Sequence, residues 1–190
     1  MLLSHALKEW STAVDGLTQG ETSILLRKGG IRERRFQVPH RQVWLYPTYE
    51  HQQPHLLKEC WAKQVQPVPS GWHPEAVTIR AWAAITHIYA VTHLPTIEAL
   101  LPFHIWQPTF VSERLRWKSG QPLLVLLLRT YRLEHPFTLS WRDSYGGCRS
   151  WIELEPPCPT LPSRPVLSDR EHQSLTARLQ LLLDQQRSQC

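Results

Sequence analysis

The sequence predicts an α+β protein: a single mixed domain with a small, mainly antiparallel sheet flanked by short helices, plus a C-terminal helix. Strand-like and helix-like patterns follow one another along the chain in short stretches. A length of 190 residues fits one domain plus an appendage, and 42% hydrophobic residues allow a buried core. The 16 prolines favour many short elements over a few long ones.

The first element is predicted to be an amphipathic helix over residues 3–15. Apolar side chains recur at helical spacing from Leu3 to Leu17, and Gly16 is positioned to close the helix.

Three strands are predicted to follow, over residues 22–27, 34–38 and 42–47. The Gly-Gly pair between the first two supplies a tight turn, because glycine adopts positive φ without steric penalty. A proline at position 47 is expected to end the third strand.

The middle of the chain mixes helices with one ambiguous segment. A short helix is predicted over residues 55–65, and further helices over 94–101 and 107–118 have proline near the first turn. Residues 76–91 contain alanines that suit a helix. Strict alternation of apolar positions and β-branched side chains favour a strand.

The last strands are predicted from an unbroken apolar run and a short final segment. Residues 122–133 are apolar enough for a strand buried on both faces, and residues 148–154 form the last strand after a turn. The α+β domain is therefore expected to span residues 1–155.

Two further segments complete the predicted organisation. The many prolines in residues 156–167 are typical of a semi-rigid linker. Residues 168–187 are expected to form an amphipathic helix that begins with a Ser168–Glu171 capping box. Its leucine stripe needs a partner surface, either the chain's own domain, which is favoured, or another chain through self-association.

Charge and cysteine content restrict the class of protein. The net charge is +5 and the pI is about 9.2, which fits polyanionic partners. Four cysteines without a C-x-x-C pair suggest small buried fillers in a reducing compartment. No apolar run reaches the roughly 20 residues that a spanning helix needs, so a cytosolic protein without membrane contact is expected.

The segment LLRKGGIRERRF is the densest basic stretch. It matches neither a mononucleotide nor a dinucleotide phosphate loop. Its cations either keep a strand edge soluble or present guanidinium groups to a phosphate backbone. The candidate phosphate-binding residues here are Arg27, Lys28, Arg32, Arg34 and Arg35.

A second basic segment, ERLRWK, lies on the predicted helix over residues 107–118. Arg114 and Lys118 are one helical turn apart, beside Trp117. An exposed tryptophan next to phosphate-binding cations suits single-stranded nucleic acid. Core packing of Trp117 is the favoured alternative.

The segment LYPTYEHQ holds candidate acid–base residues. Glu50 and His51 combine an acceptor with a titratable ring. His51 and His55 have metal-ligand spacing, but Pro54 interrupts the helix that this spacing requires. Neither a metal nor a cofactor is predicted.

The segment YGGCRSWIEL offers a candidate nucleophile. Arg149 follows Cys148 directly, and a neighbouring cation can lower the pKa of a thiol. A turn with a buried cysteine is the favoured alternative.

Five motifs in order, ALKEW, GETSILLRKGGIRE, LYPTYEHQ, HIW and YGGCRSWIEL, resemble the bacterial family known as domain of unknown function 1802. The resemblance covers about residues 6–154. It implies a link to restriction systems, since this domain is found attached to restriction-endonuclease-like regions. The chain has no Glu-x-Lys nuclease pattern, which speaks against such an activity here.

Three functions remain open from the sequence. The leading one is binding of a polyanion, nucleic acid above all, through the basic segments. The second is a hydrolase or transferase acting on a phosphorylated or acyl substrate, with Glu50, His51 and Cys148 as its catalytic groups. The third is a non-catalytic module that docks a protein partner through its C-terminal helix.

Overall fold

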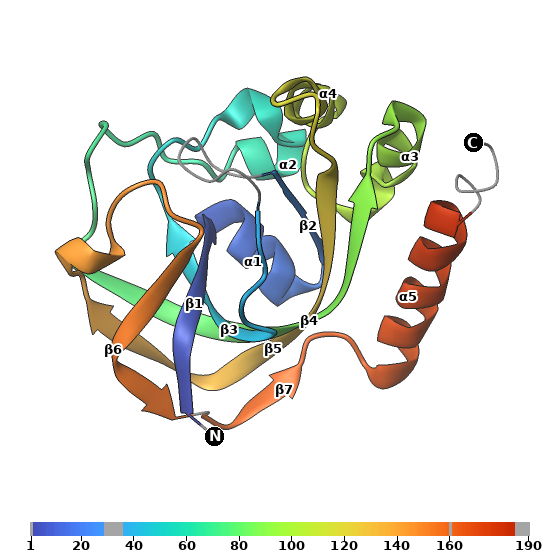
Figure 1. Cartoon of the computed structure of the whole chain (residues 1–190). Coiled ribbons are helices and arrows are strands. Elements are labelled where there is room, and N and C mark those ends of the chain that lie inside the picture. The colour runs from blue at the N-terminus through green and yellow to red at the C-terminus, as the bar shows by residue number, and fades with distance from the viewer. Residues whose placement is uncertain (1, 29–35, 160, 185–190) are drawn as a thin grey trace.

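A single mixed sheet organises the chain, and the computed structural model describes it over residues 2–28, 36–159 and 161–184 (Figure 1). The strand order is β2-β5-β4-β3-β1-β6, with β7 beside β5. The strands are β1 (Leu2–Trp10), β2 (Ile24–Arg27), β3 (Gln42–Thr48), β4 (Ala76–Val91), β5 (Leu123–Ser140), β6 (Trp151–Pro159) and β7 (Ser163–Pro165). The α+β architecture predicted from the sequence is confirmed.

Short helices surround this sheet, and a longer one closes the chain. The α-helices are α1 (Ser11–Gln19), α2 (Glu59–Ala62), α3 (Leu94–Ala99), α4 (Pro108–Arg116) and α5 (Asp169–Asp184). Single 3-10 turns are η1 (Pro54–Leu56), η2 (Leu101–Phe103) and η3 (Asp143–Tyr145). In the described part of the chain, no helix has the length and apolar character needed to cross a membrane.

Two long antiparallel strands, β4 and β5, form the spine of the sheet and curve strongly (Figure 1). Their register shifts between Ile79 and Ala81 and again between Ile85 and His87. Such irregularities bend and twist a strand pair. The bend gives the sheet two apolar clusters, a large one under the helices and a smaller one between β1, β3, β6 and the far ends of β4 and β5.

The predictions for the central strands are confirmed. The ambiguous segment is a strand with the predicted bounds, because alternate side chains from Val77 to Ile85 are buried on one face. β5 is buried along its apolar run as expected, lying between β2 and β4. β3 continues through Pro47 to Thr48. The predicted Gly-Gly turn and the first two residues of the strand predicted over residues 34–38 lie outside the described residues. The strand prediction was wrong for residues 36–38, which are described and form no strand.

The first predicted helix was wrong in its position. Residues 2–10 form β1, which pairs in parallel with β3 and antiparallel with β6, so hydrogen bonds on both sides override a locally helical spacing. The helix begins only at Ser11. It ends at Gly20 and not at Gly16, because Gly20 adopts φ +82° and its N–H bonds to the carbonyls of Gly16 and Leu17.

The segment predicted as a Pro-rich linker is built into the sheet. β6 extends to Pro159, which pairs with Leu2, and β7 pairs with β5 through Ser163 and Leu133. Both are edge strands, where the missing N–H of proline costs no ladder hydrogen bond. The predicted domain boundary at residue 155 therefore falls inside β6.

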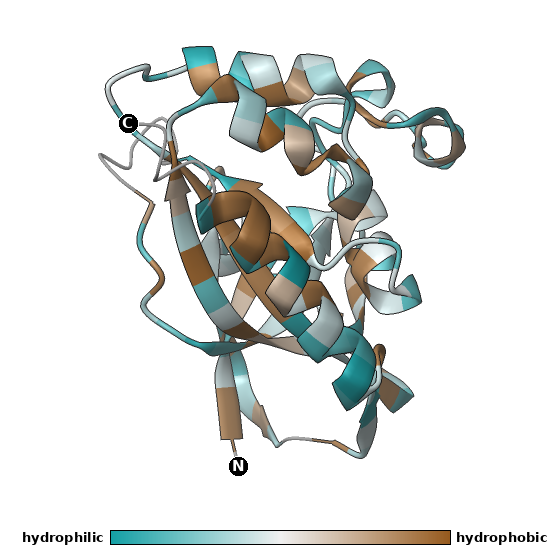
Figure 2. Cartoon of the chain, turned by 90° about the vertical axis from the view of Figure 1, so that its right-hand side faces the viewer, coloured by the Kyte–Doolittle hydropathy of each residue, from teal (hydrophilic) through white to brown (hydrophobic). Residues whose placement is uncertain are grey.

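The C-terminal helix lies against the chain's own core. The Ser168–Glu171 capping box is present, since the Glu171 carboxylate accepts from the Ser168 N–H at 2.8 Å and the Glu171 N–H donates to the Ser168 hydroxyl at 3.3 Å. Leu179 and Leu183 are buried in the large apolar cluster. Figure 2, seen from the side of α5, shows hydrophobic stretches of strand behind this helix.

Candidate anion-binding site

The segments singled out in the sequence meet where the parallel strands β1 and β3 end. Their carboxyl ends share one edge of the sheet, which places ALKEW beside LYPTYEHQ. The Thr48 hydroxyl donates to the Glu9 carbonyl at 3.0 Å. The side-chain oxygen of Gln52 accepts from the Thr12 N–H and hydroxyl, which secures the start of α1.

An ion pair between Arg27 and Glu9 lies at this junction. Arg27 Nη2 is 2.9 Å from Glu9 Oε2, and the two side chains are only 17% and 10% exposed. The guanidinium also donates to the Lys8 carbonyl and lies 5.7 Å from the centre of the Phe36 ring. Arg27 is thus neutralised and held against the protein.

A second guanidinium, that of Arg114, lies near this ion pair. Burial, and then the neighbouring Arg27, lower the pKa of Arg114, while Glu9 and Glu113 act in the opposite direction. The Arg114 Cζ lies 5.0 Å from the centre of the Phe110 ring. The site therefore brings two guanidiniums close enough for their charges to interact.

Lys28 has a structural position. Its side chain is 4% exposed, burial lowers its pKa, and Nζ donates to the Leu115 carbonyl at 2.8 Å. This bond attaches the end of β2 to α4, so the two basic segments are brought together. The other predicted cations of the first segment, Arg32, Arg34 and Arg35, lie outside the described residues.

The end of α4 carries an aromatic ring with two cations beside it. Trp117 is half-buried and belongs to neither apolar cluster, so the core position favoured by the sequence was wrong. The helix ends at Arg116, and the extended backbone of Trp117 directs the chain off the helix. Arg114 Cζ lies 5.9 Å and Lys118 Nζ 4.9 Å from the centre of the Trp117 ring.

Lys8 connects the junction to the glycine-rich loop before β6. Its Nζ donates to the carbonyls of Tyr145 at 2.6 Å and Gly147 at 2.8 Å. Burial lowers the pKa of Lys8, and the charges of Cys148 and Glu50 oppose that shift. The segments LYPTYEHQ and YGGCRSWIEL therefore both lie near Lys8.

The predicted catalytic groups have mixed surroundings. Cys148 is exposed, so the buried cysteine favoured by the sequence was wrong; the flat glycine-rich loop leaves its side chain uncovered. Glu50 accepts from the Gly71 N–H at 2.6 Å, a bond that lowers its pKa, and lies 3.2 Å from His51 Nε2. A carboxylate held ionised in this way is a poor proton acceptor near neutral pH. In the part of the chain described, no three His, Cys, Asp or Glu side chains are grouped as metal ligands.

Removal of the Lys8 ammonium is expected to loosen this loop. Lys8→Met would leave two carbonyls without their donor, at a cost of about 1–2 kcal/mol in unfolding free energy. Urea unfolding measures this loss. Unchanged stability would show that Lys8 does not hold the loop.

Three contributors to this site were not predicted from their chemistry: Lys8, Glu9 and Gln52. Lys8 and Glu9 were assigned to a helix, where their relation to β3 cannot be seen. The motif ALKEW itself was the available signal, since it belongs to the set that resembles a family.

Comparison with known proteins gives a family match and a group of distant structures. A family model described as "Domain of unknown function (DUF1802)" matches residues 6–178. No match was found among curated proteins.

The similar solved structures include ASCH from Zymomonas mobilis and two of its point mutants. The first is 14% identical, covers 91% of this chain and 93% of its own, and has a TM-score of 0.48. The serine-to-alanine mutant is 13% identical over 92% and 94%, with a TM-score of 0.48. The tyrosine-to-phenylalanine mutant is 12% identical over 91% and 96%, with a TM-score of 0.47. Likeness at this level carries no argument about function.

Proposed function

The chain belongs to the family described as a domain of unknown function (DUF1802), and we propose that this member binds nucleic acid, single strands above all. The binding surface would be the α4 face, which we define as Arg114, Trp117 and Lys118. The observation that carries the proposal is the half-buried Trp117 ring, whose centre lies 5.9 Å from Arg114 Cζ and 4.9 Å from Lys118 Nζ.

The α4 face combines the two chemistries that single strands offer. Every base has a flat π-surface, and stacking on an aromatic side chain is worth about 1–3 kcal/mol per base. The guanidinium and ammonium groups beside the ring can contact the phosphates that flank a stacked base. A ring with two cations beside it therefore suits a stacked base together with the phosphates that flank it.

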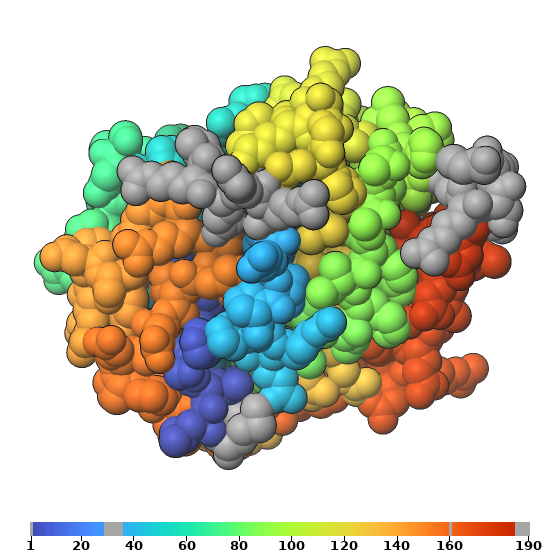
Figure 3. Space-filling view, viewed as in Figure 1, coloured from blue at the N-terminus to red at the C-terminus, as the bar shows by residue number. Residues whose placement is uncertain are grey.

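The charge behind the face supports the same conclusion. Arg27 pairs with Glu9, and burial and the charge of Arg27 lower the pKa of the nearby Arg114, so positive charge is concentrated behind the face. Figure 3 shows α4, in yellow, and the segment before β6, in orange, on one side of the molecule. Arg116 and Arg149 are exposed in these segments. Neither makes an ion pair with any residue whose position is described.

Binding to labelled oligonucleotides tests the proposal. Trp117→Ala should weaken binding to a single strand about tenfold, and Arg114→Met by a similar factor, with a smaller effect on a duplex. If Arg114, Lys118 and Arg149 each contact one phosphate, the log–log salt slope on single strands should be about −2. Fluorescence anisotropy from low to moderate salt measures both quantities.

Lys63→Met is the matched control, because Lys63 is an exposed lysine of the helical layer that already pairs with Glu59 at 2.7 Å. It should bind as the unaltered protein does. Absence of binding at low salt, or equal binding by Trp117→Ala and the unaltered protein, would overturn the proposal.

A further inference from the structure

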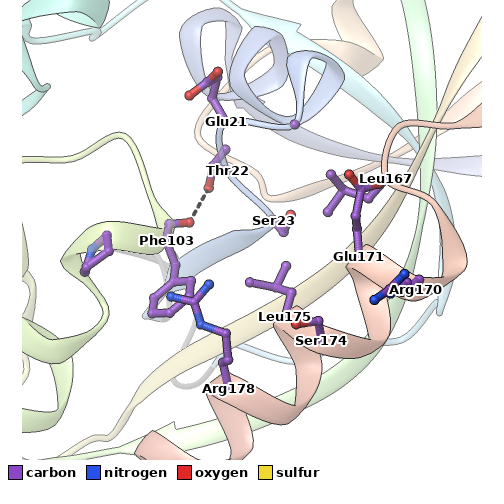
Figure 4. Close-up of a pocket in the computed structure, with 12 residues that line it drawn as sticks. Glu21, Thr22, Ser23, Phe103, Leu167, Arg170, Glu171, Ser174, Leu175 and Arg178 are labelled. Carbon is purple, nitrogen blue, oxygen red and sulfur yellow. Dashed lines mark hydrogen bonds between the residues drawn. The ribbon is translucent and has the colours of Figure 1, made fainter.

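A cavity of about 420 Å³ lies between α5 and the loop that joins α1 to β2 (Figure 4). Its volume is in the range of small-molecule sites. One wall is α5, the opposite wall is the GETS segment, and Phe103 of η2 lies between them. The cavity is separate from the α4 face. It adjoins the start of β2, whereas α4 is attached to the other end of β2 through the Lys28–Leu115 hydrogen bond.

The wall formed by α5 presents two arginines in register. Arg170, Ser174 and Arg178 line the cavity at spacings of four residues, so they share one face of the helix. Eight residues at a rise of 1.5 Å separate the two arginine backbones by about 12 Å. Figure 4 shows the two guanidiniums apart, with Ser174 and Leu175 between them.

These guanidiniums lack acidic partners. No carboxylate of the described residues lies within ion-pair distance of Arg170 or Arg178. The Glu171 carboxylate is committed to the capping box with Ser168. Arg178 Cζ lies 5.0 Å from the centre of the Phe103 ring, which fixes the guanidinium over an apolar surface.

The opposite wall adds polar groups on a fixed backbone. Thr22 is 2% exposed and its hydroxyl donates to the carbonyls of Ile24 and Phe103, so this wall is attached to η2. Ser23 and Ser174 bring hydroxyl groups to the cavity, and Leu167 and Leu175 bring apolar surface. Two carboxylates also line the cavity: that of Glu171, bonded to Ser168, and that of Glu21, which Figure 4 shows turned away from both guanidiniums. The cavity therefore has a guanidinium at each end and a mixed, partly apolar middle.

We propose that this cavity binds an elongated small molecule that carries an anionic group at each end, in the class of dicarboxylates and bisphosphates. Each guanidinium binds one anionic end through its forked donors, and the middle of the ligand lies against Leu175 and Phe103. Carboxylate and phosphate are the two sources of this shared chemistry.

A length series of probes tests the proposal on the full chain. Malonate, succinate, glutarate, adipate and pimelate supply carboxylates at increasing separation. The bisphosphate of 1,6-hexanediol supplies two separated phosphates, and hexanoate supplies one carboxylate only. At about 10 mM, bound probes should raise the melting temperature by mass action. We expect the affinity to pass through a maximum within the series, with hexanoate at least about tenfold weaker than the best diacid.

Variants assign the binding to the cavity. Arg170→Met and Arg178→Met should each weaken the best probe about tenfold or more, and both side chains are exposed, so folding should be retained. Arg164→Met is the control, because Arg164 is an exposed arginine of β7 that does not line the cavity. Calorimetric titration measures each affinity.

Selective binding of the hexanediol bisphosphate over all diacids would assign the phosphate class, and the reverse would assign the carboxylate class. The proposal is overturned if no probe binds, if hexanoate binds as well as the best diacid, or if both cavity variants bind like Arg164→Met.

Discussion

Glu9→Gln is expected to destabilise the fold by about 3 kcal/mol at neutral pH. Glutamine keeps the size of Glu9 and the oxygen that accepts from the Trp10 N–H, but it removes the carboxylate that pairs with Arg27. Breaking a buried ion pair by removing one partner costs about 3–5 kcal/mol, because the other charge is left uncompensated. The low end applies here, since both side chains retain some exposure. Urea unfolding measures the loss.

The matched control is Glu98→Gln, an exposed carboxylate on α3, which should change stability by less than about 0.5 kcal/mol. Adding Arg27→Met to Glu9→Gln should recover part of the loss, because the stranded guanidinium is then absent. A double variant whose destabilisation equals the sum of the two single changes would show that the charges are not coupled.

Acid is expected to destabilise the protein through His104 by about 3 kcal/mol between pH 6.5 and pH 4. His104 is 1% exposed, and burial, followed by the charge of Lys58, lowers its pKa from 6.5 to about 4. Its Nδ1 accepts from the Trp106 N–H at 3.2 Å, so the folded protein holds the ring neutral. The unfolded chain binds the proton first as pH falls, so stability is complete above pH 6.5 and is lost toward pH 4.

Urea unfolding of the unaltered protein and of His104→Gln across this range isolates the effect. Glutamine does not titrate. The other groups with shifted pKa that titrate in acid, among them His40, His172, Glu50 and Glu171, contribute to both proteins and cancel in the difference. The gap between the two stability curves should narrow by about 3 kcal/mol from pH 6.5 to pH 4. Parallel curves over that range would contradict a neutral buried His104.

The strand and helix pattern could be predicted well where the signal was local. β4 and the helices α3 and α4 followed from alternation, β-branched content and proline placement. The Ser168–Glu171 capping box followed from four adjacent residues, because both partners of the hydrogen bonds lie in the same turn.

The failures share one physical cause. The apolar residues from Leu3 to Leu17 have helical spacing, yet the first part of this segment is β1. Its hydrogen bonds go to β3 and β6, which lie far away in the sequence. The proline-rich segment reads as a linker, yet its edge position lets it join the sheet. In both cases a distant strand supplies the partner, and no local pattern records that partner.

The candidate site shows the same division. The basic segments and Trp117 beside them could be found in the sequence. Which of the cations face solvent could not be predicted from it. Lys28 is buried because α4 offers the Leu115 carbonyl to its ammonium, and Arg27 is paired because Glu9 lies beside it.

By itself, the sequence determined the kinds of element, the positive charge balance and the motifs that resemble a family. Only the tertiary structure decided that Lys28 is buried, that Arg27 is paired, and that Trp117 is half-buried with two cations beside it. The physical reason is that propensity, capping and charge are properties of neighbouring residues. Burial and ion pairing depend on segments that meet only when β1 pairs with β3 and β6 in the folded sheet.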